Sequence, residues 1–129
     1  RIGHRVNDAT STFGVIAHTA AWAHGEPWRQ QVLAYLQGNR DVLAQRLAQQ
    51  LPQIEHIPAQ GTYLAWLDCR ALALAPTPQA FFRQHAKVAL TDGGECGDGG
   101  QGHVRFNFAL PRPLLEQALT QMAQALAAR

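Results

Sequence analysis

The chain has 129 residues, of which 47% are hydrophobic and 16% charged, and its formal net charge is +2. This balance favours one soluble globular domain with a modest core. Its 11 basic and 9 acidic residues are scattered along the chain, which argues against nucleic-acid binding. No apolar run approaches the roughly 20 residues that cross a bilayer, and no leader pattern opens the sequence. We therefore expect a cytoplasmic protein that does not bind membranes.

The residues that most often carry metal or redox chemistry are few and scattered. Cys69 and Cys96 match no spaced metal pattern, and the six histidines occur singly, so we expect free thiols, a reducing compartment and no metal site. Ser11 is the only serine, and no local motif joins it to a base and an oxyanion hole. We expect no complete catalytic site within the chain. Because the sequence begins at Arg1 rather than methionine, we also expect a fragment of a longer protein.

The first half of the chain is predicted to be helical. Residues 1–26 form a polar connector and then a helix over about 11–24, because alanine and large apolar residues recur there at helical spacing. Gly25 ends this helix. A long connecting helix is expected over 27–51, with an apolar stripe along one face and Pro52 after its last turn.

The second half, residues 52–129, is predicted to be a small domain in which short strands and helices mix. Its layout predicts a two-layer α/β (α+β) sandwich, in which helices cover a small mixed or antiparallel sheet. The expected strands are 54–57, 62–67, 87–90 and 103–108, and the expected helices run from 77 to 85 and from 114 onward.

The segment from Thr91 to Arg112 joins a glycine-dense loop to a short strand. Alternation along that strand predicts an apolar face and a polar face, and the polar face carries His103, Arg105 and Asn107. A guanidinium has a planar fork that can bind both oxygens of a carboxylate at once. Arg105 is therefore our candidate for binding a small anion. The alternative is an ordinary exposed strand arginine, which needs no ligand.

Within the loop, Gly97, Gly99 and Gly102 satisfy the GxGxxG pattern of dinucleotide-binding turns. Such a turn must follow a strand and open a helix, whereas this loop opens a strand. We therefore expect a loop that needs positive φ angles and close backbone approach rather than a phosphate site.

Several stretches together carry a resemblance to a known family. One is the alanine-rich helix with its following glycine and tryptophan, another is the YL..N pattern at 35–39, and GTYLAWLD at 61–68 is the most specific. The glycine loop and its strand fit the pattern dG..fG..G.g..R.N.a.p, except that Cys96 stands where an aromatic is usual. Over nearly its whole length, the chain resembles the C-terminal (small) domain of the fold-type I pyridoxal-phosphate enzymes, the class I/II aminotransferase superfamily. Within that superfamily it is most similar to carbon–sulfur β-lyases of the cystathionine β-lyase type.

The resemblance implies a role for Arg105, because the matching arginine of the family binds the α-carboxylate of the amino-acid substrate. Tyr63 and Asn107 are further candidates for substrate binding. The lysine that bonds covalently to the cofactor belongs to the large domain upstream, and Lys87 matches no such motif. The resemblance implies pyridoxal 5′-phosphate as the cofactor, bound mainly by that large domain. It assigns no catalytic or cofactor-binding residue to this chain.

For the intact protein, the resemblance implies a homodimeric enzyme that acts on a small, sulfur-containing amino acid. Loss of the α-proton would be followed by expulsion of a thiol from the β-carbon. Residues 52–129 would form the small substrate-closing domain, and the fragment alone would be inactive.

Two alternatives stay open at the level of the sequence. One is the small domain of a class I/II aminotransferase, which uses the same arginine but returns the amino group to a keto acid. The other is a non-catalytic binding or regulatory module that retains this fold.

Overall fold

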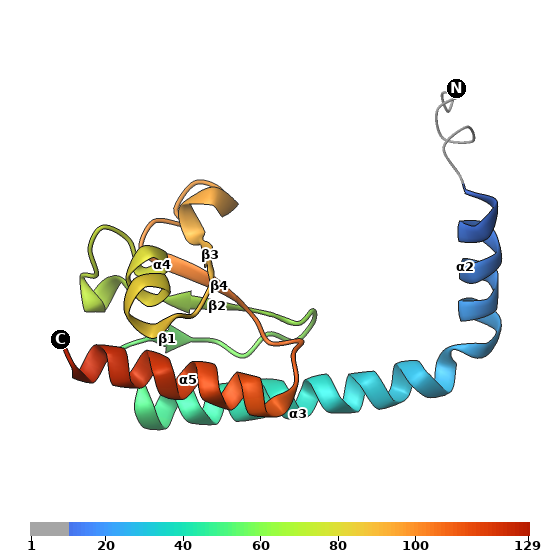
Figure 1. Cartoon of the computed structure of the whole chain (residues 1–129), viewed down its shortest axis with the longest axis horizontal. Coiled ribbons are helices and arrows are strands. Elements are labelled where there is room, and N and C mark those ends of the chain that lie inside the picture. Colours follow the sequence, from blue (N-terminus) through green and yellow to red (C-terminus); the bar gives the residue numbers. More distant parts are fainter. Residues whose placement is uncertain (1–10) are drawn as a thin grey trace. The chain divides into compact units, whose positions relative to one another are not determined.

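The structure of the chain is a computed structural model that describes residues 11–129 (Figure 1). The connector expected at the start of the chain falls mainly in residues 1–10, outside the described part. The chain divides into two compact units, Arg1–Tyr35 and Leu36–Arg129. The second unit includes the later turns of the long helix, which the sequence analysis assigned to a separate connecting element.

Helix α2 (Thr12–His24) lies in the first unit. The hydroxyl of Ser11 accepts a hydrogen bond from the backbone N–H of Gly14 at 3.4 Å and so caps the helix. A glycine is required at position 25, because an added Cβ there would lie 2.4 Å from the carbonyl oxygen of Ala21. No residue of α2 is buried. The large apolar side chains exposed in this unit are Phe13, Val15, Ile16, Trp22, Trp28, Leu33 and Tyr35.

Helix α3 (Glu26–Gln50) is continuous, and each of its ends lies within one residue of the expected bounds. Its buried residues are Asn39, Leu43 and Leu47, all in the second unit. Their spacing of about four residues places them on one face of the helix. This face packs into the core of the second unit, which gives the polar Asn39 an unusual position among leucines.

The sheet of the second unit has four strands in the order β1-β2-β4-β3, and every neighbouring pair is antiparallel. The strands are β1 (Glu55–His56), β2 (Leu64–Asp68), β3 (Thr91–Asp92) and β4 (His103–Asn107). The central pair, β2 and β4, supplies most of the pairing, and the two short strands flank it. This arrangement confirms the predicted α+β class with a small antiparallel sheet.

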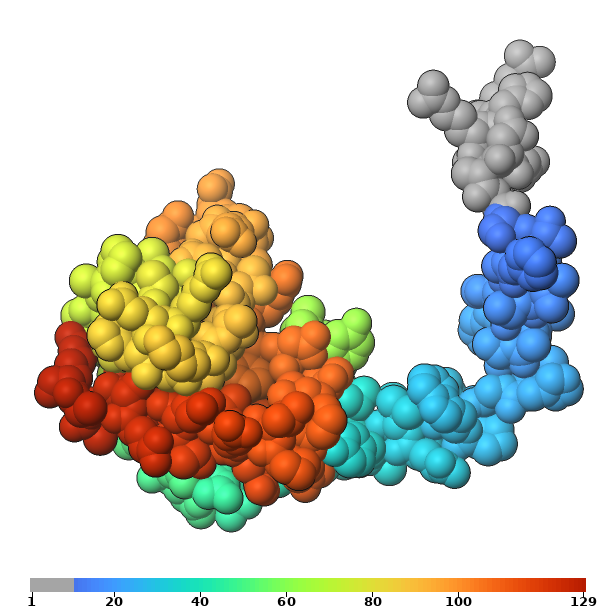
Figure 2. All heavy atoms as spheres, in the orientation of Figure 1, coloured from blue at the N-terminus to red at the C-terminus, as the bar shows by residue number. Residues whose placement is uncertain are grey.

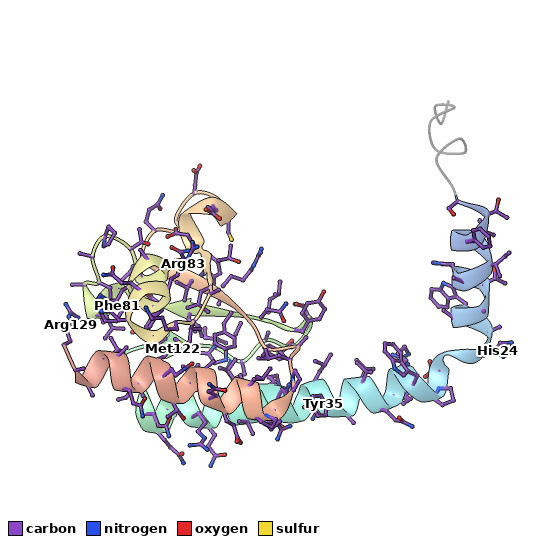
Figure 3. The ribbon with its side chains drawn as sticks, in the orientation of Figure 1. His24, Tyr35, Phe81, Arg83, Met122 and Arg129 are labelled. Atoms are coloured by element: carbon purple, nitrogen blue, oxygen red, sulfur yellow. The ribbon has the colours of Figure 1, made fainter. Side chains whose placement is uncertain are left out.

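Helices pack on one face of this sheet. Helix α5 (Arg112–Ala127) buries Leu115, Leu119 and Met122, and Figure 3 shows Met122 projecting from α5 toward the sheet. Helix α4 (Pro78–Phe81) begins where a helix was expected, and the hydroxyl of Thr77 caps it by accepting from the N–H of Ala80 at 3.1 Å. A π-helical turn (Phe82–Ala86) continues α4, and 3-10 turns cover Arg70–Leu72 and Gly93–Cys96.

The prediction of a strand at residues 87–90 is wrong, because the third strand forms later, at Thr91–Asp92. Lys87 has a φ of 57°, in the left-handed region, and ends the π-helical turn that precedes it. The backbone N–H of Val88 is bound to the carbonyl of Phe82 at 3.2 Å. These residues therefore close a helix instead of extending a sheet. The last helix likewise begins at Arg112, earlier than expected.

Candidate functional site

The register of β2, β3 and β4 divides their residues between two faces of the sheet. Trp66 and Thr91 both stand opposite Arg105, and Asp68 stands opposite His103. Side chains directly opposite in an antiparallel pair share a face. We call the face of Trp66, Arg105 and their partners the open face, because the helices and the apolar core occupy the other side.

Arg105 is exposed on this open face, near the middle of β4. Its Nη2 donates a hydrogen bond to the hydroxyl of Thr91 at 3.3 Å. Within residues 11–129, no carboxylate forms an ion pair with it. Its remaining N–H donors are free to bind an anion from solution, because a guanidinium carries five. The arginine thus combines a fixed strand position with unused donors, which is the condition for binding a carboxylate.

An aromatic and acidic cluster lies beside Arg105 on the same face. The rings of Trp66 and His103 stack with their centroids 5.3 Å apart. His103 Nε2 lies 3.6 Å from a carboxylate oxygen of Asp68. Arg70 donates to both oxygens of Asp68, at 3.0 Å from Nε and 2.6 Å from Nη2. Hydrogen bonds from Arg70 lower the pKa of Asp68 from 3.8 to about 2, so this carboxylate is charged at neutral pH.

Two of the hollows that border the open face do not include Arg105. One, of about 230 Å³, is lined by Glu55, His56, Ile57, Trp66, Asp68 and His103. The other, of about 330 Å³, lies between the segment 87–90, the end of β4 and helix α5, and Asn107 is among its lining residues. Arg105 lines neither of these hollows and is exposed on the surface.

The other two predicted substrate residues lie close to the end of β4. Asn107 shares the open face with Arg105, but its Oδ1 accepts from the backbone N–H of Ala109 at 2.9 Å. Tyr63 precedes β2, and its side chain is 48% exposed. The carbonyl of Tyr63 accepts from the N–H of Phe108 at 3.0 Å. The structure thus gives both residues a local structural role, and their contact with a substrate stays a prediction.

Sequence reasoning assigned no role to the buried side chain of Asn39. Its Nδ2 donates to the carbonyls of Phe108 at 2.9 Å and Leu110 at 2.8 Å, and its Oδ1 accepts from Nε of Arg112 at 2.7 Å. All three bonds join α3 to the segment that follows β4. In the sequence, the sign of this role was an asparagine within the apolar stripe of the predicted long helix. A polar side chain is rarely buried at such a position unless its polar atoms have hydrogen-bond partners.

The glycine loop has the predicted backbone. Gly97, Gly99 and Gly102 have φ angles of 129°, 83° and 77°. Gly93 and Gly100 pass so close that a Cβ on Gly93 would lie 2.1 Å from the carbonyl oxygen of Gly100. Figure 2 shows the loop as a projection on the surface of the second unit. The loop leads into β4 and so sets where the strand that carries Arg105 begins.

Both cysteines have free thiols, as expected. Cys69 is fully buried after β2, and burial raises the pKa of its thiol to about 12. Cys96 is exposed in the glycine loop. Among residues 11–129, no group of three or more histidine, cysteine or acidic side chains could hold a metal ion, and no helix is long and apolar enough to cross a membrane.

Comparison with known proteins gives a consistent set of relatives, although no family model matches the chain. A Mycobacterium leprae protein named "Putative cystathionine beta-lyase" is 40% identical over 98% of this chain, which covers 35% of that protein. The cystathionine beta-lyase of Corynebacterium glutamicum is 34% identical over 92% of the chain and 32% of its own length. The chain therefore spans about a third of the length of these relatives.

Solved structures agree with the sequence relatives. A structure from Corynebacterium diphtheriae, described as a "putative plp-dependent beta-cystathionase", is 38% identical with a TM-score of 0.92, over 98% of this chain and 34% of that one. The pyridoxal-phosphate-bound C–S lyase of Staphylococcus hominis, in complex with L-cycloserine, is 30% identical with a TM-score of 0.86, over 92% and 32% of the two chains.

The chain belongs to the fold-type I pyridoxal-phosphate superfamily, as a C-terminal portion of its fold. Lys87 is the only lysine. Its side chain is exposed at the end of the π-helical turn, and its ammonium donates to the carbonyl of Gln84 at 2.8 Å. The matching structures include pyridoxal-phosphate-bound enzymes, and the expectation that this cofactor is bound mainly outside this chain stays a prediction.

Proposed function

We propose that this chain is the substrate-facing C-terminal part of a pyridoxal-phosphate-dependent carbon–sulfur β-lyase of the cystathionine β-lyase type. The full-length protein would convert cystathionine and water to homocysteine, pyruvate and ammonia. In this reaction the chain contributes Arg105, which binds the α-carboxylate of the amino acid. The described residues supply no group for the chemistry at the β-carbon, so the chain alone is expected to be inactive.

The observation that carries the proposal is the combination of an unpaired arginine with the identity of the relatives. Arg105 is exposed on the open face and is without a carboxylate partner among the described residues. Its one side-chain bond, to Thr91 at 3.3 Å, holds a single nitrogen. A bidentate pair with a substrate carboxylate would use the remaining donors and is stronger than a neutral hydrogen bond.

The lyase activity is tested with the full-length enzyme and cystathionine. Formation of pyruvate and homocysteine without an added keto acid supports the proposal. Turnover that depends on a keto-acid acceptor would overturn it in favour of transamination. A matched reaction with the 129-residue chain alone tests whether the fragment is inactive, as proposed.

A second candidate, an aminotransferase, is favoured by one specific likeness. A pyridoxal-phosphate-bound structure from Clostridium difficile, described as a putative aminotransferase, is 33% identical with a TM-score of 0.86. The same arginine would serve both reactions, since both begin from an amino acid with a free carboxylate. The acceptor dependence of turnover, rather than any feature of this chain, separates the two.

Assembly and gene context test the rest of the proposal. The intact enzyme is proposed to be a homodimer, which the mass of the full-length protein in solution would check. Sequencing the gene upstream of Arg1 tests the non-catalytic alternative. An open reading frame that encodes a large domain with its lysine supports the enzyme, whereas an initiator codon at this point would favour a separate binding module.

A further inference from the structure

Asn39 stands out among the buried residues of α3 because it is polar, fully buried and bound only to residues far away in sequence. We propose that Asn39 and Arg112 form a positioning lock that sets the location of Arg105 by fixing the end of β4. The inference rests on the function proposed above, because it concerns the residue that binds the substrate carboxylate. Neither lock residue is proposed to touch the substrate.

The backbone that follows Arg105 is held by several hydrogen bonds. Phe108 is held from two sides, since its N–H donates to the carbonyl of Tyr63 and its own carbonyl accepts from Nδ2 of Asn39. The N–H of Ala109 donates to Asn107, and the carbonyl of Leu110 accepts from Asn39. The bond from Phe108 to Tyr63 continues the β2–β4 register, whereas the bonds to the side chains of Asn39 and Asn107 lie outside the backbone pairing of the sheet.

The start of β4 is also held by a hydrogen bond. The N–H of Cys69 donates to the carbonyl of Gly102 at 3.0 Å, immediately before β4. Arg105 thus lies between two anchored points, one at Gly102 and one at Phe108. A strand held at both ends cannot shift its register, and a shift of a single residue would move Arg105 to the core face. The Asn39 bonds supply the anchor that lies outside the sheet.

Arg112 packs against Gly38 and Asn39 of α3. Its Nε donates to Oδ1 of Asn39 at 2.7 Å, which orients the amide so that Nδ2 faces the two carbonyls. Gly38 provides the space, because a Cβ there would lie 2.6 Å from Nη2 of Arg112. In an exposed helix interior glycine weakens the helix relative to alanine. At this position, the glycine is explained by the guanidinium that lies against the helix.

A buried asparagine could also serve stability alone, so the test must separate positioning from stability. The full-length enzyme is assayed with S-ethyl-L-cysteine and with its α-carboxamide, which lacks the charged carboxylate. The ratio of kcat/KM for the acid to that for the amide reports how well Arg105 meets the carboxylate. A general loss of folded enzyme lowers both rates and leaves this ratio unchanged.

The variants are Asn39→Leu, Gly38→Ala and Arg105→Ala, with Leu43→Ala as the control. Leu43 is fully buried on the same face of α3 but makes no polar contact with the segment after β4. Arg105→Ala should lower the acid-to-amide ratio most. Asn39→Leu should lower it by about tenfold, because a misplaced charged group loses much of its binding. Gly38→Ala, which displaces only Arg112, should lower it less, and Leu43→Ala should leave it unchanged.

A double variant completes the test. Combined with Arg105→Ala, Asn39→Leu should lower the ratio no further, since residues that act through one another are not additive. The positioning role is contradicted if Asn39→Leu and Gly38→Ala lower kcat/KM for the acid and for the amide equally, so that the acid-to-amide ratio is unchanged. If Asn39→Leu fails to fold, Gly38→Ala decides alone. If Arg105→Ala leaves the acid-to-amide ratio unchanged, the proposed role of Arg105 in substrate binding is contradicted instead. Failure of the positioning proposal and failure of the proposed function are therefore distinguishable.

Discussion

The two faces of the sheet are built from alternating residues of the same strands, yet they differ in burial and composition. On the core face, Ala65 and Leu67 of β2 meet Phe106 and Val104 of β4, and all four are buried. On the open face, the same strands carry tryptophan, arginine, histidine and asparagine side chains. One face therefore holds the fold together, and the other is available to a ligand.

This difference predicts that stability and substrate binding can be changed separately within a single strand. Neighbouring residues of β4 point to opposite faces, so one substitution should affect folding and the next should affect recognition.

Phe106→Ala should have the largest effect. Phe106 is 3% exposed in the core, and its removal should lower the free energy of unfolding by about 3–5 kcal/mol. Urea unfolding of the chain measures this loss. Trp66→Ala on the open face is the control, and it should cost about 1–2 kcal/mol because the ring is already partly exposed. Equal losses for the two variants would contradict the division between the faces.

Arg105→Ala should leave the free energy of unfolding nearly unchanged but weaken amino-acid binding to the full-length enzyme by about 2–4 kcal/mol. The Michaelis constant for cystathionine measures the effect. Arg105→Lys should restore only part of the binding, because an ammonium lacks the bidentate fork. Arg83, an exposed arginine of the π-helical turn, supplies the control Arg83→Ala. An unchanged Michaelis constant for Arg105→Ala would count against the substrate role.

The pair of Asp68 and Arg70 predicts a smaller, pH-dependent effect. The pKa of Asp68 in the folded chain is lowered to about 2 by hydrogen bonds from Arg70. A lowered carboxyl pKa stabilises the folded state above the unfolded pKa near 4 and loses this effect as the pH falls through about 2. Because Arg70 is well exposed, the contribution should be under about 1 kcal/mol.

Urea unfolding of the chain and of Arg70→Ala at pH 5, 4, 3 and 2 tests this effect. The difference in unfolding free energy should be largest at pH 5 and should disappear toward pH 2. A difference that stays constant across this range would show that Arg70 acts through packing rather than through the charge of Asp68.

The two thiols should differ in reactivity without any effect on folding. Iodoacetamide at pH 8 should modify Cys96 first, because its thiol is exposed, whereas Cys69 is buried with a pKa raised to about 12. Mass spectrometry over time separates the two sites. The variant Cys96→Ser should lose the fast phase. Rapid modification of Cys69 in that variant would mean that the core opens readily.

Local patterns in the sequence predicted much of this fold. Alternation along residues 103–108 placed Arg105 and Asn107 on one face and the apolar residues on the other, because side chains in a strand must alternate. The helical stripe, the Thr77 cap and the positive φ angles of the loop glycines also follow from local chemistry. Such features depend on residues close together in sequence.

The features that the sequence did not predict depend on contacts between residues that are far apart in the chain. The segment 87–90 is apolar enough for a strand, but the left-handed Lys87 ends the preceding turn and delays the strand to Thr91. Trp66 meets Arg105 only through the register of two strands that are far apart in sequence. Asn39 finds its partners about 70 residues away, which no local spacing could indicate.

The most direct measurement is a crystal structure of the full-length enzyme bound to an amino-acid inhibitor that keeps a free carboxylate. The account predicts that both carboxylate oxygens lie within hydrogen-bonding distance of the Arg105 guanidinium, on the face that also carries Trp66. A carboxylate bound by a different cation, with Arg105 pointing into solvent, would contradict it.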